Sequence, residues 1–307
     1  MTKEITYTSA YAQFDPSMVG ESEFILADFA DELIRKGYAT DKKPSKVNDE
    51  GIGIKPIRLF NKNLKSLFKR GYNRNKVTAY MATFPSREDV LEKAILSLYK
   101  QVDELVVLTN GDMVVPKYPN VSTYNVLDKI GDVGCAGKFI FAYEWKGYVL
   151  TVDDDFIYPE DYVAETIKAI DKYGKKAVIS WHGRTLFEHS ERYKNGHKEF
   201  YQCCYDVDSD YAVNIIGTGV CGFHADVFLG NPYDVIEMSY TNSSDIWFSL
   251  SCDQRRIPMI VPKHKEGWLI PLETGRNCIS FGTKYDEMLT GIINSRNWVL
   301  QDKIVKK

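Results

Sequence analysis

Three consecutive carboxylates, Asp153, Asp154 and Asp155, carry the clearest chemistry in the sequence. They follow an apolar run, YVLTV, that is typical of a buried strand. Adjacent carboxylates repel one another, so crowding them is costly unless a cation compensates. Carboxylate oxygens suit Mg²⁺ or Mn²⁺, and Mg²⁺ typically joins one or two of them with substrate phosphates. We expect Asp153 and Asp155 to share one face and Asp154 to point away; a solvated acidic turn is the alternative.

Further polar residues follow other strand-like segments. Residues 83–87 (TFPSR) come after a β-rich run that starts at Val77, and Asn110 comes after the apolar run at residues 105–108. Asp132 precedes a segment of small residues that carries Lys138. In sheets of parallel strands, ligands bind beyond the carboxyl ends of the strands. We therefore expect these residues and the aspartate triplet to form one site.

Two late residues are also candidates. Asp245 falls in the first turn of a helix that Ser243 or Ser244 can cap, and the helix dipole favours a carboxylate there, which makes a structural role one interpretation. His264 follows the strand-like run MIVP, and a neutral imidazole is a competent metal ligand. An ordinary surface histidine is the alternative for His264.

The elements that must position these residues alternate from Val77 onward. Strand-like segments alternate with segments of helical periodicity, which indicates parallel βαβ units in an α/β sheet. The expected strands are residues 77–84, 105–108, 121–126, 148–152 and 177–180. The expected helices are residues 86–98, with a capping-box-like start at Ser86, residues 134–145, and residues 160–173, closed by Gly174.

The N-terminal part differs from this pattern. Residues 24–33 have helical spacing, and residues 42–55 have the composition of a loop. Residues 61–76 carry six basic residues and no acid, which predicts either a solvated helix or a contact for anionic membrane or nucleic acid. We expect an extension over residues 1–75, a main domain over residues 76–270 and a C-terminal segment over residues 271–307.

Composition limits the class of protein. The 307 residues hold 39 Lys and Arg against 42 Asp and Glu, a formal net charge of −3 that argues against binding nucleic acid by bulk charge alone. No run approaches ~18 apolar residues, and the N-terminus lacks an apolar signal core, so we expect a cytoplasmic protein. The six cysteines form no CxxC pair and are expected to be reduced thiols.

Several motifs in order resemble those of the GT-A glycosyltransferases, and among them the family 2-like bacterial enzymes that build capsule and lipopolysaccharide glycans. The motifs are ATFPSR, LVVLTNG, GDVGCAGKF and LTVDDDFIYPEDYV, followed by ISWHGRTL, VNIIGTGVCGFH, SSDIWFSL and IPMIVPKHKEGWL. The resemblance covers about residues 76 to 270 and implies a Rossmann-like, mostly parallel central sheet flanked by helices. It also implies a divalent metal, Mn²⁺ or Mg²⁺, and a nucleotide-sugar donor, for which a UDP-sugar is favoured.

The resemblance assigns roles to individual residues. The donor would contact residues that follow the strands: Thr83, Pro85, Arg87, Asn110, Asp132, Lys138, Asp153 and Asp154. Asn110 stands where these enzymes often have an acidic residue that binds the nucleobase. This difference leaves the identity of the nucleotide undetermined. Asp153, Asp155 and His264 would hold the metal. Asp245 would face the acceptor hydroxyl as general base, and residues 217–219 (GTG) would form the floor of the acceptor site, a tight turn being the alternative.

The resulting hypothesis is a metal-dependent glycosyltransferase, hexosyl- or pentosyl-transferring, that inverts by direct displacement. A bacterial surface glycan is the favoured acceptor. A peripheral location at the inner membrane face, with residues 61–76 as the contact, is an alternative to a purely cytoplasmic one. Hydroxymethylated bases of phage DNA are the alternative acceptor. A sugar-phosphate nucleotidyltransferase is disfavoured, because ATFPSRED lacks the Gly-rich phosphate loop such enzymes need. A non-catalytic sugar- or nucleotide-binding module is disfavoured by the intact acids.

Overall fold

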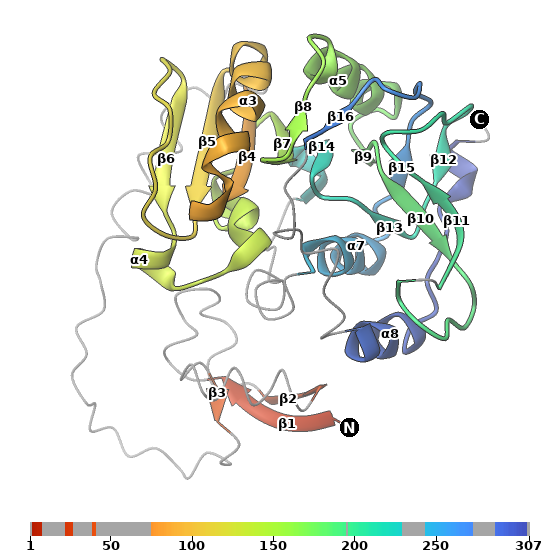
Figure 1. Cartoon of the computed structure of the whole chain (residues 1–307). Helices are drawn as coiled ribbons and strands as arrows, with labels where there is room; N and C mark the ends of the chain where they lie inside the picture. The colour runs from red at the N-terminus through yellow and green to blue at the C-terminus, as the bar shows by residue number, and fades with distance from the viewer. Residues whose placement is uncertain are drawn as a thin grey trace. The chain divides into compact units, whose positions relative to one another are not determined.

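The structure is a computed structural model that describes residues 2–7, 22–26, 39–40, 75–194, 196–228, 243–272 and 286–305. The chain divides into two compact units, Met1–Tyr72 and Asn73–Lys307, which are coloured along the chain in Figure 1. The three-part division expected from the sequence stays a prediction. Among the described residues, no helix is both long enough and apolar enough to cross a membrane.

The N-terminal unit contains a small antiparallel sheet. Its strands are β1 (Thr2–Tyr7), β2 (Ser22–Leu26) and β3 (Ala39–Thr40), in the order β2-β1-β3. The helix predicted over residues 24–33 is wrong at its start, because Phe24 pairs with Glu4 and Leu26 with Thr2. A short apolar run fits a strand as well as a helix, and strand pairing decides between them. The segments 27–33, 42–55 and 61–74 lie outside the described residues.

The larger unit is built on an eight-stranded sheet in the order β12-β15-β9-β14-β7-β4-β5-β6. β6, β5, β4 and β7 run parallel to one another, and β9 and β15 form a further parallel pair. β14 runs antiparallel to both β7 and β9. The strands are β4 (Val77–Thr83), β5 (Glu104–Thr109), β6 (Val121–Asn125), β7 (Tyr148–Asp153), β9 (Val178–Ser180), β12 (Tyr211–Ala212), β14 (Val220–His224) and β15 (Met259–Val261).

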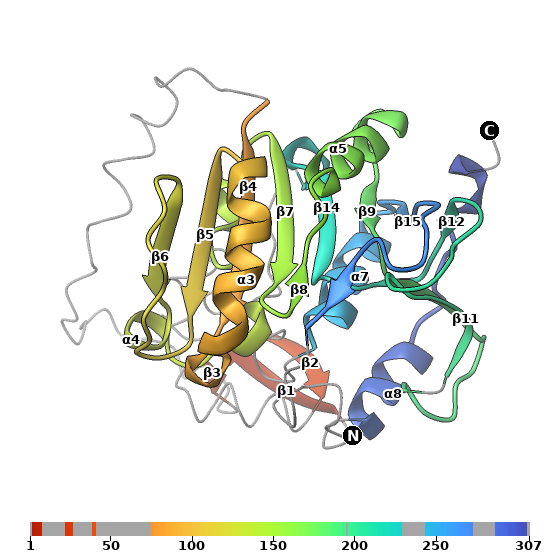
Figure 2. The same ribbon diagram turned by 45° about the horizontal axis from the view of Figure 1, so that its top comes forward.

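Helices cover both faces of this sheet. Helix α3 (Glu88–Leu98) and helix α5 (Tyr162–Lys172) lie over the same face in Figure 2, and their apolar sides join one core with alternate residues of β4, β5 and β7. On the other face, Phe139 of the 3-10 helix η5 (Gly134–Phe139) packs against Phe248 of α7 (Ser244–Gln254). The predicted fold class, α/β with a mostly parallel central sheet flanked by helices, is therefore confirmed.

The register brings the carboxyl ends of the parallel strands level. Thr83 pairs with Thr109 at the ends of β4 and β5, and Ala82 pairs with Asp153 at the end of β7. The expected strands in this half of the sheet are present, and α5 is followed by Gly174 in the left-handed region (φ 63°). The aspartate triplet and residues 83–87 consequently meet at one edge.

Two predicted helices differ in detail. The segment 134–145 is not an α-helix but two 3-10 helices, η5 and η6 (Ala142–Glu144). Gly134 has φ 52°, outside the α region, and Gly137 packs close to Ala82 and Leu108, so small residues here serve close contact rather than helix propagation. Ser86 makes no capping hydrogen bond: it lies inside the 3-10 helix η3 (Pro85–Arg87), which precedes α3.

The remaining described elements lie outside the eight-stranded sheet. A second sheet, in the order β11-β10-β13, consists of β10 (Gly183–Leu186), β11 (His197–Tyr201) and β13 (Ile215–Ile216). The others are β8 (Phe156–Ile157), β16 (Ile270–Pro271), α4 (Leu127–Ile130), α8 (Asp286–Asn294), η4 (Tyr99–Gln101), η7 (Ala225–Phe228) and η9 (Asp302–Ile304).

Candidate active site

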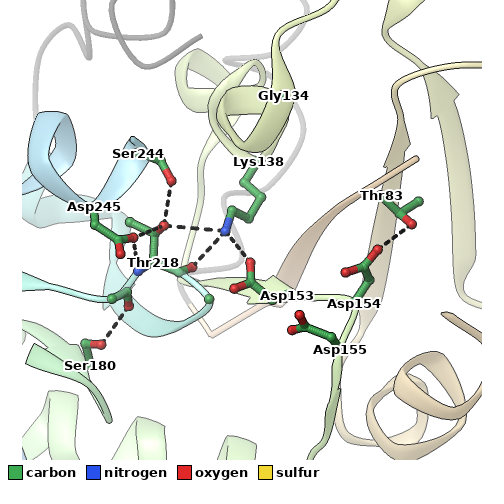
Figure 3. A network of polar contacts seen from close by, with 12 residues as sticks. Thr83, Gly134, Lys138, Asp153, Asp154, Asp155, Ser180, Thr218, Ser244 and Asp245 are labelled. Carbon is green, nitrogen blue, oxygen red and sulfur yellow. Dashed lines mark hydrogen bonds and ion pairs between the residues drawn. The ribbon is translucent and has the colours of Figure 1, made fainter. Parts of the chain in front are cut away.

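Asp153 ends β7 beside a buried cation. The Lys138 ammonium of η5 donates to Asp153 Oδ1 at 2.6 Å, and the Lys138 side chain is only 2% exposed (Figure 3). Burial opposes the charge of Lys138, but the neighbouring Asp153 carboxylate leaves the pKa of the amine raised. Lys138 is thus a fixed positive charge inside the site rather than a surface lysine.

Asp154 and Asp155 lie in the turn after the strand, so strand alternation no longer sets their directions. Thr83 donates its hydroxyl hydrogen to Asp154 Oδ2 at 2.6 Å, and the Arg87 guanidinium lies 3.7 Å from Asp154 and 3.0 Å from Asp155. Burial raises the pKa of Asp154 to about 6. Burial, followed by the charge of Asp153, also raises the pKa of Asp155. Arg87 therefore bridges two acids that the sequence placed on opposite faces.

Asp245 is held by neutral donors. Its Oδ1 accepts both the backbone N–H of Thr218 at 2.8 Å and the Thr218 hydroxyl at 2.7 Å. The Ser244 hydroxyl lies 2.8 Å from the same Thr218 hydroxyl, while the expected capping hydrogen bond from Ser243 is not formed. Because both Thr218 donors bind Oδ1, they leave Asp245 Oδ2 for another partner.

Thr218 joins the two acids into one network. The Lys138 ammonium lies 3.4 Å from both the hydroxyl and the carbonyl oxygen of Thr218 (Figure 3). A Cβ on Gly219 would collide with the Asp153 carboxylate, so any larger residue here would displace that carboxylate. Asp153, Lys138, Thr218 and Asp245 thus form a continuous chain of contacts. The GTG motif signalled close approach, but nothing in the sequence indicated that Thr218 binds Asp245.

The loop before η5 is fastened by two of the predicted donor residues. Asn110 donates its amide to the carbonyl of Gly134 and accepts the N–H of Val133, at 3.0 and 3.3 Å. Asp132 Oδ1 accepts the N–H of Gly134 at 2.9 Å. Both side chains therefore position the loop that carries Lys138. Pro85, in η3, lies against Gly111 in the turn after β5.

The predicted metal ligands differ in how they fit a cation. Asp153 and Asp155 are hard oxygen donors that stay 43% and 21% exposed, and their mutual repulsion is the kind that a divalent ion relieves. His264 is 7% exposed, with Nδ1 2.7 Å from the carbonyl of Pro262 and Nε2 3.2 Å from that of Gln202. No cluster of three metal-binding side chains occurs in the part of the chain that the structure describes. Metal binding by Asp153, Asp155 and His264 stays a prediction.

The tryptophans of the motifs ISWHGRTL, SSDIWFSL and IPMIVPKHKEGWL differ in burial. Trp181 and Trp247 are buried in the core, and Trp181 donates to Thr166. Trp268 is half-buried and donates to Asp161. A further residue, Tyr158, was missed by sequence reasoning: its hydroxyl accepts the N–H of Asp153 at 2.9 Å and lies 2.9 and 3.0 Å from the carbonyls of Asp153 and Gly219. It fixes the end of β7.

Comparison with known proteins gives limited similarity. No protein-family model matches the chain, and no curated protein matches it. A crystal structure of S. aureus TarS 1–349 in complex with UDP-GlcNAc aligns with a TM-score of 0.45 and 13% identity, over 67% of this chain and 61% of that one. A second structure of S. aureus TarS 1–349 gives 0.33 and 14%, over 54% and 56%. A structure of S. aureus TarS gives 0.32 and 17%, over 50% and 29%. The chain spans less than two thirds of each of these structures, and with such TM-scores the site geometry has to carry the functional argument.

Proposed function

We propose that this chain is a glycosyltransferase that takes its sugar from a nucleotide-sugar donor with the help of Mn²⁺ or Mg²⁺. The observation that carries the proposal is the network linking Asp153 to Asp245 through Lys138 and Thr218, at the carboxyl edge of the sheet. One end of this network offers acids and buried cations suited to a metal-bound diphosphate. The other end offers a carboxylate with one oxygen unused by Thr218.

The acids and cations divide the chemistry between them. Asp153 and Asp155 would hold the divalent ion, which would neutralise the charge that builds on the departing diphosphate. Lys138 places a positive charge beside the same position, and Thr83, Pro85 and Arg87 would border the nucleotide. Asn110 and Asp132 support this site by fixing the loop before Lys138.

Asp245 would act as the general base. Its Oδ2 would accept the proton of the acceptor hydroxyl while the acceptor oxygen forms a bond to the anomeric carbon. The bond between that carbon and the diphosphate oxygen breaks in the same step, and the diphosphate leaves with the electron pair. This displacement inverts the configuration at the anomeric carbon.

The proposal includes an acceptor. A bacterial surface glycan is the preferred acceptor, and the net charge of −3 argues mildly against hydroxymethylated DNA.

A nucleotidyltransferase is disfavoured further by the segment after β4. This segment is a 3-10 helix that begins at a proline and contains no glycine, so it is not a phosphate-binding loop. We propose a cytoplasmic location, with residues 61–76 as a contact for membrane or nucleic acid.

A donor panel tests the proposal. Thermal unfolding of the full chain is measured with UDP-, GDP- and CDP-sugars, with and without Mn²⁺, because a ligand that binds only the folded state raises the melting temperature. We expect one donor class to stabilise the protein in a Mn²⁺-dependent way, and Asp155→Asn to remove that dependence. Asp89→Asn, an exposed aspartate on α3, is the matched control and should keep it. Absence of stabilisation across the panel would contradict the proposal.

A further inference from the structure

A strip of aromatic and basic side chains continues outward from the GTG motif. His182 follows β9 and lies against Gly217, where an added Cβ would be 2.9 Å from the His182 Cβ. The His182 ring meets the ring of Phe200 edge-on at 5.0 Å, and the Arg184 guanidinium lies over the same Phe200 ring at 5.0 Å. Arg184 and Phe200 are direct partners across β10 and β11. The three side chains thus extend from the catalytic network along the second sheet.

Arg184 contacts two aromatic rings and has no acidic partner in the part of the chain that the structure describes. Its guanidinium carbon lies over the rings of both Phe200 and Tyr193, at 5.0 and 4.8 Å from the ring centroids, and these two contacts restrict the movement of the group. Among the residues that the structure describes, this group forms one hydrogen bond, a long 3.4 Å contact from Nη1 to the carbonyl of Tyr193. Within the described residues, Arg184 forms no ion pair. A half-buried arginine of this kind is a ready donor for an oxyanion.

The surroundings hold this arrangement in place. The N–H of Tyr193 donates to the Thr290 hydroxyl of α8 at 2.8 Å, and Ser190 exchanges hydrogen bonds with Asn294 of the same helix. The loop that carries the Tyr193 ring is therefore fastened at both points to α8. Such fixed supports reduce the entropy lost when a ligand binds.

His182 adds a neutral donor next to Arg184. It is half-buried, its ring nitrogens make no hydrogen bond in the described part of the chain, and burial lowers its pKa to about 4. The negative charges of Asp245 and Asp153 and the positive charge of Arg184 all act on His182. A neutral imidazole offers one N–H donor, and the guanidinium group of Arg184 offers two parallel N–H donors.

We infer that Arg184 and His182 recognise a phosphate ester on the acceptor, close to the hydroxyl that receives the sugar. A tetrahedral phosphate has three oxygens beyond the ester, enough for the guanidinium fork and the imidazole together, whereas the fork alone uses both oxygens of a carboxylate. This inference rests on the proposed function, since it assigns the acceptor class for the same site.

Binding of simple sugars tests it separately from donor binding. Titration calorimetry on the full chain, with and without UDP and Mn²⁺, compares glucose 6-phosphate, glucuronate and glucose. We expect glucose 6-phosphate to bind about 10-fold or more tighter than glucose, as a charge-assisted hydrogen bond would give. Arg184→Gln should abolish this preference, and Arg184→Lys should keep part of it, because lysine retains the charge and loses the fork. Arg192→Gln, an exposed arginine in the adjoining loop, should leave it unchanged.

Three results would overturn the inference. Equal binding of glucose and glucose 6-phosphate, including no binding of either, removes anion recognition. Glucuronate binding as tightly as glucose 6-phosphate, with the same loss in Arg184→Gln, removes the assignment to phosphate. Displacement of glucose 6-phosphate by UDP, together with weaker UDP binding by Arg184→Gln, moves Arg184 to the donor. In each case the thermal-shift panel with nucleotide-sugars reports on the proposed function independently.

Discussion

The acids at the end of β7 and the acid at the start of α7 are held in different ways. Asp153, Asp154 and Asp155 face the cations Lys138 and Arg87, whereas Asp245 is held by the hydroxyl and N–H of Thr218 and forms no ion pair in the described residues. Acids clustered around positive charge suit a diphosphate with its metal. An acid that is held by neutral donors has no charged partner and is available to accept a proton. The contrast separates donor chemistry from base chemistry within one network.

The largest expected effect tests the base. Asp245→Asn keeps the oxygen that accepts from Thr218 but cannot take a proton, so we expect turnover to fall about 10²–10⁴-fold with the donor-induced thermal shift retained. Asp253→Asn, the same change on the same helix, should stay within about twofold of the parent, since asparagine still accepts the Val299 N–H. Equal turnover of Asp245→Asn and the parent would place the base elsewhere.

The close approach of the two regions is tested at Gly219. A methyl group there would collide with the Asp153 carboxylate, so we expect Gly219→Ala to lower the free energy of unfolding by about 1–3 kcal/mol and to weaken donor binding. Gly291→Ala in α8 is the control: nothing lies within 4 Å of its added Cβ, and the change should be neutral or slightly stabilising. Similar losses in both variants would mean that the Asp153 contact is not what matters.

His182, which lies against Gly217 of the GTG motif, provides a pH-dependent measurement. Its folded-state pKa of about 4 lies below the ordinary value of 6.5, so the unfolded chain binds the proton more readily. The His182 contribution to stability is therefore present above pH 6.5 and is lost as the pH falls toward 4. The difference in unfolding free energy between the parent and His182→Asn should change by about 1–3 kcal/mol across this interval. The two proteins are unfolded with urea at each pH. A difference in unfolding free energy that stays constant with pH would contradict the burial of a neutral imidazole.

The smallest expected effect concerns the Thr218 hydroxyl, which links Asp245 to the rest of the network. Thr218→Val removes the hydroxyl that binds Asp245 and Ser244 but keeps the backbone N–H bond, so we expect a stability loss of about 1 kcal/mol and turnover about 10-fold lower. Thr218→Ser retains the hydroxyl and should restore most of both. If valine and serine behave alike in steady-state kinetics, the hydroxyl does not position Asp245.

The fold and the edge that carries the site were predictable because they depend on local pattern. Alternating strand and helix periodicity after Val77 predicted β4, β5, β7 and α5, and the parallel order then brought residues 83–87 and the triplet together. Prediction failed where local propensity was ambiguous. Residues 24–26 form a strand through pairing with β1, and residues 134–145 form two 3-10 helices, the first of which begins at Gly134 with φ 52°.

By itself, the sequence determined which acids stand at strand and helix ends, since apolar periodicity and neighbouring polar residues fix those boundaries. Only the tertiary structure decided their partners. Asp153 meets Lys138 across 15 positions of the chain, and Asp245 meets Thr218 across 27. Pairs so far apart in the chain form only when strands and loops pack, and a side chain's charge environment depends on those packed neighbours rather than on the residues beside it in sequence.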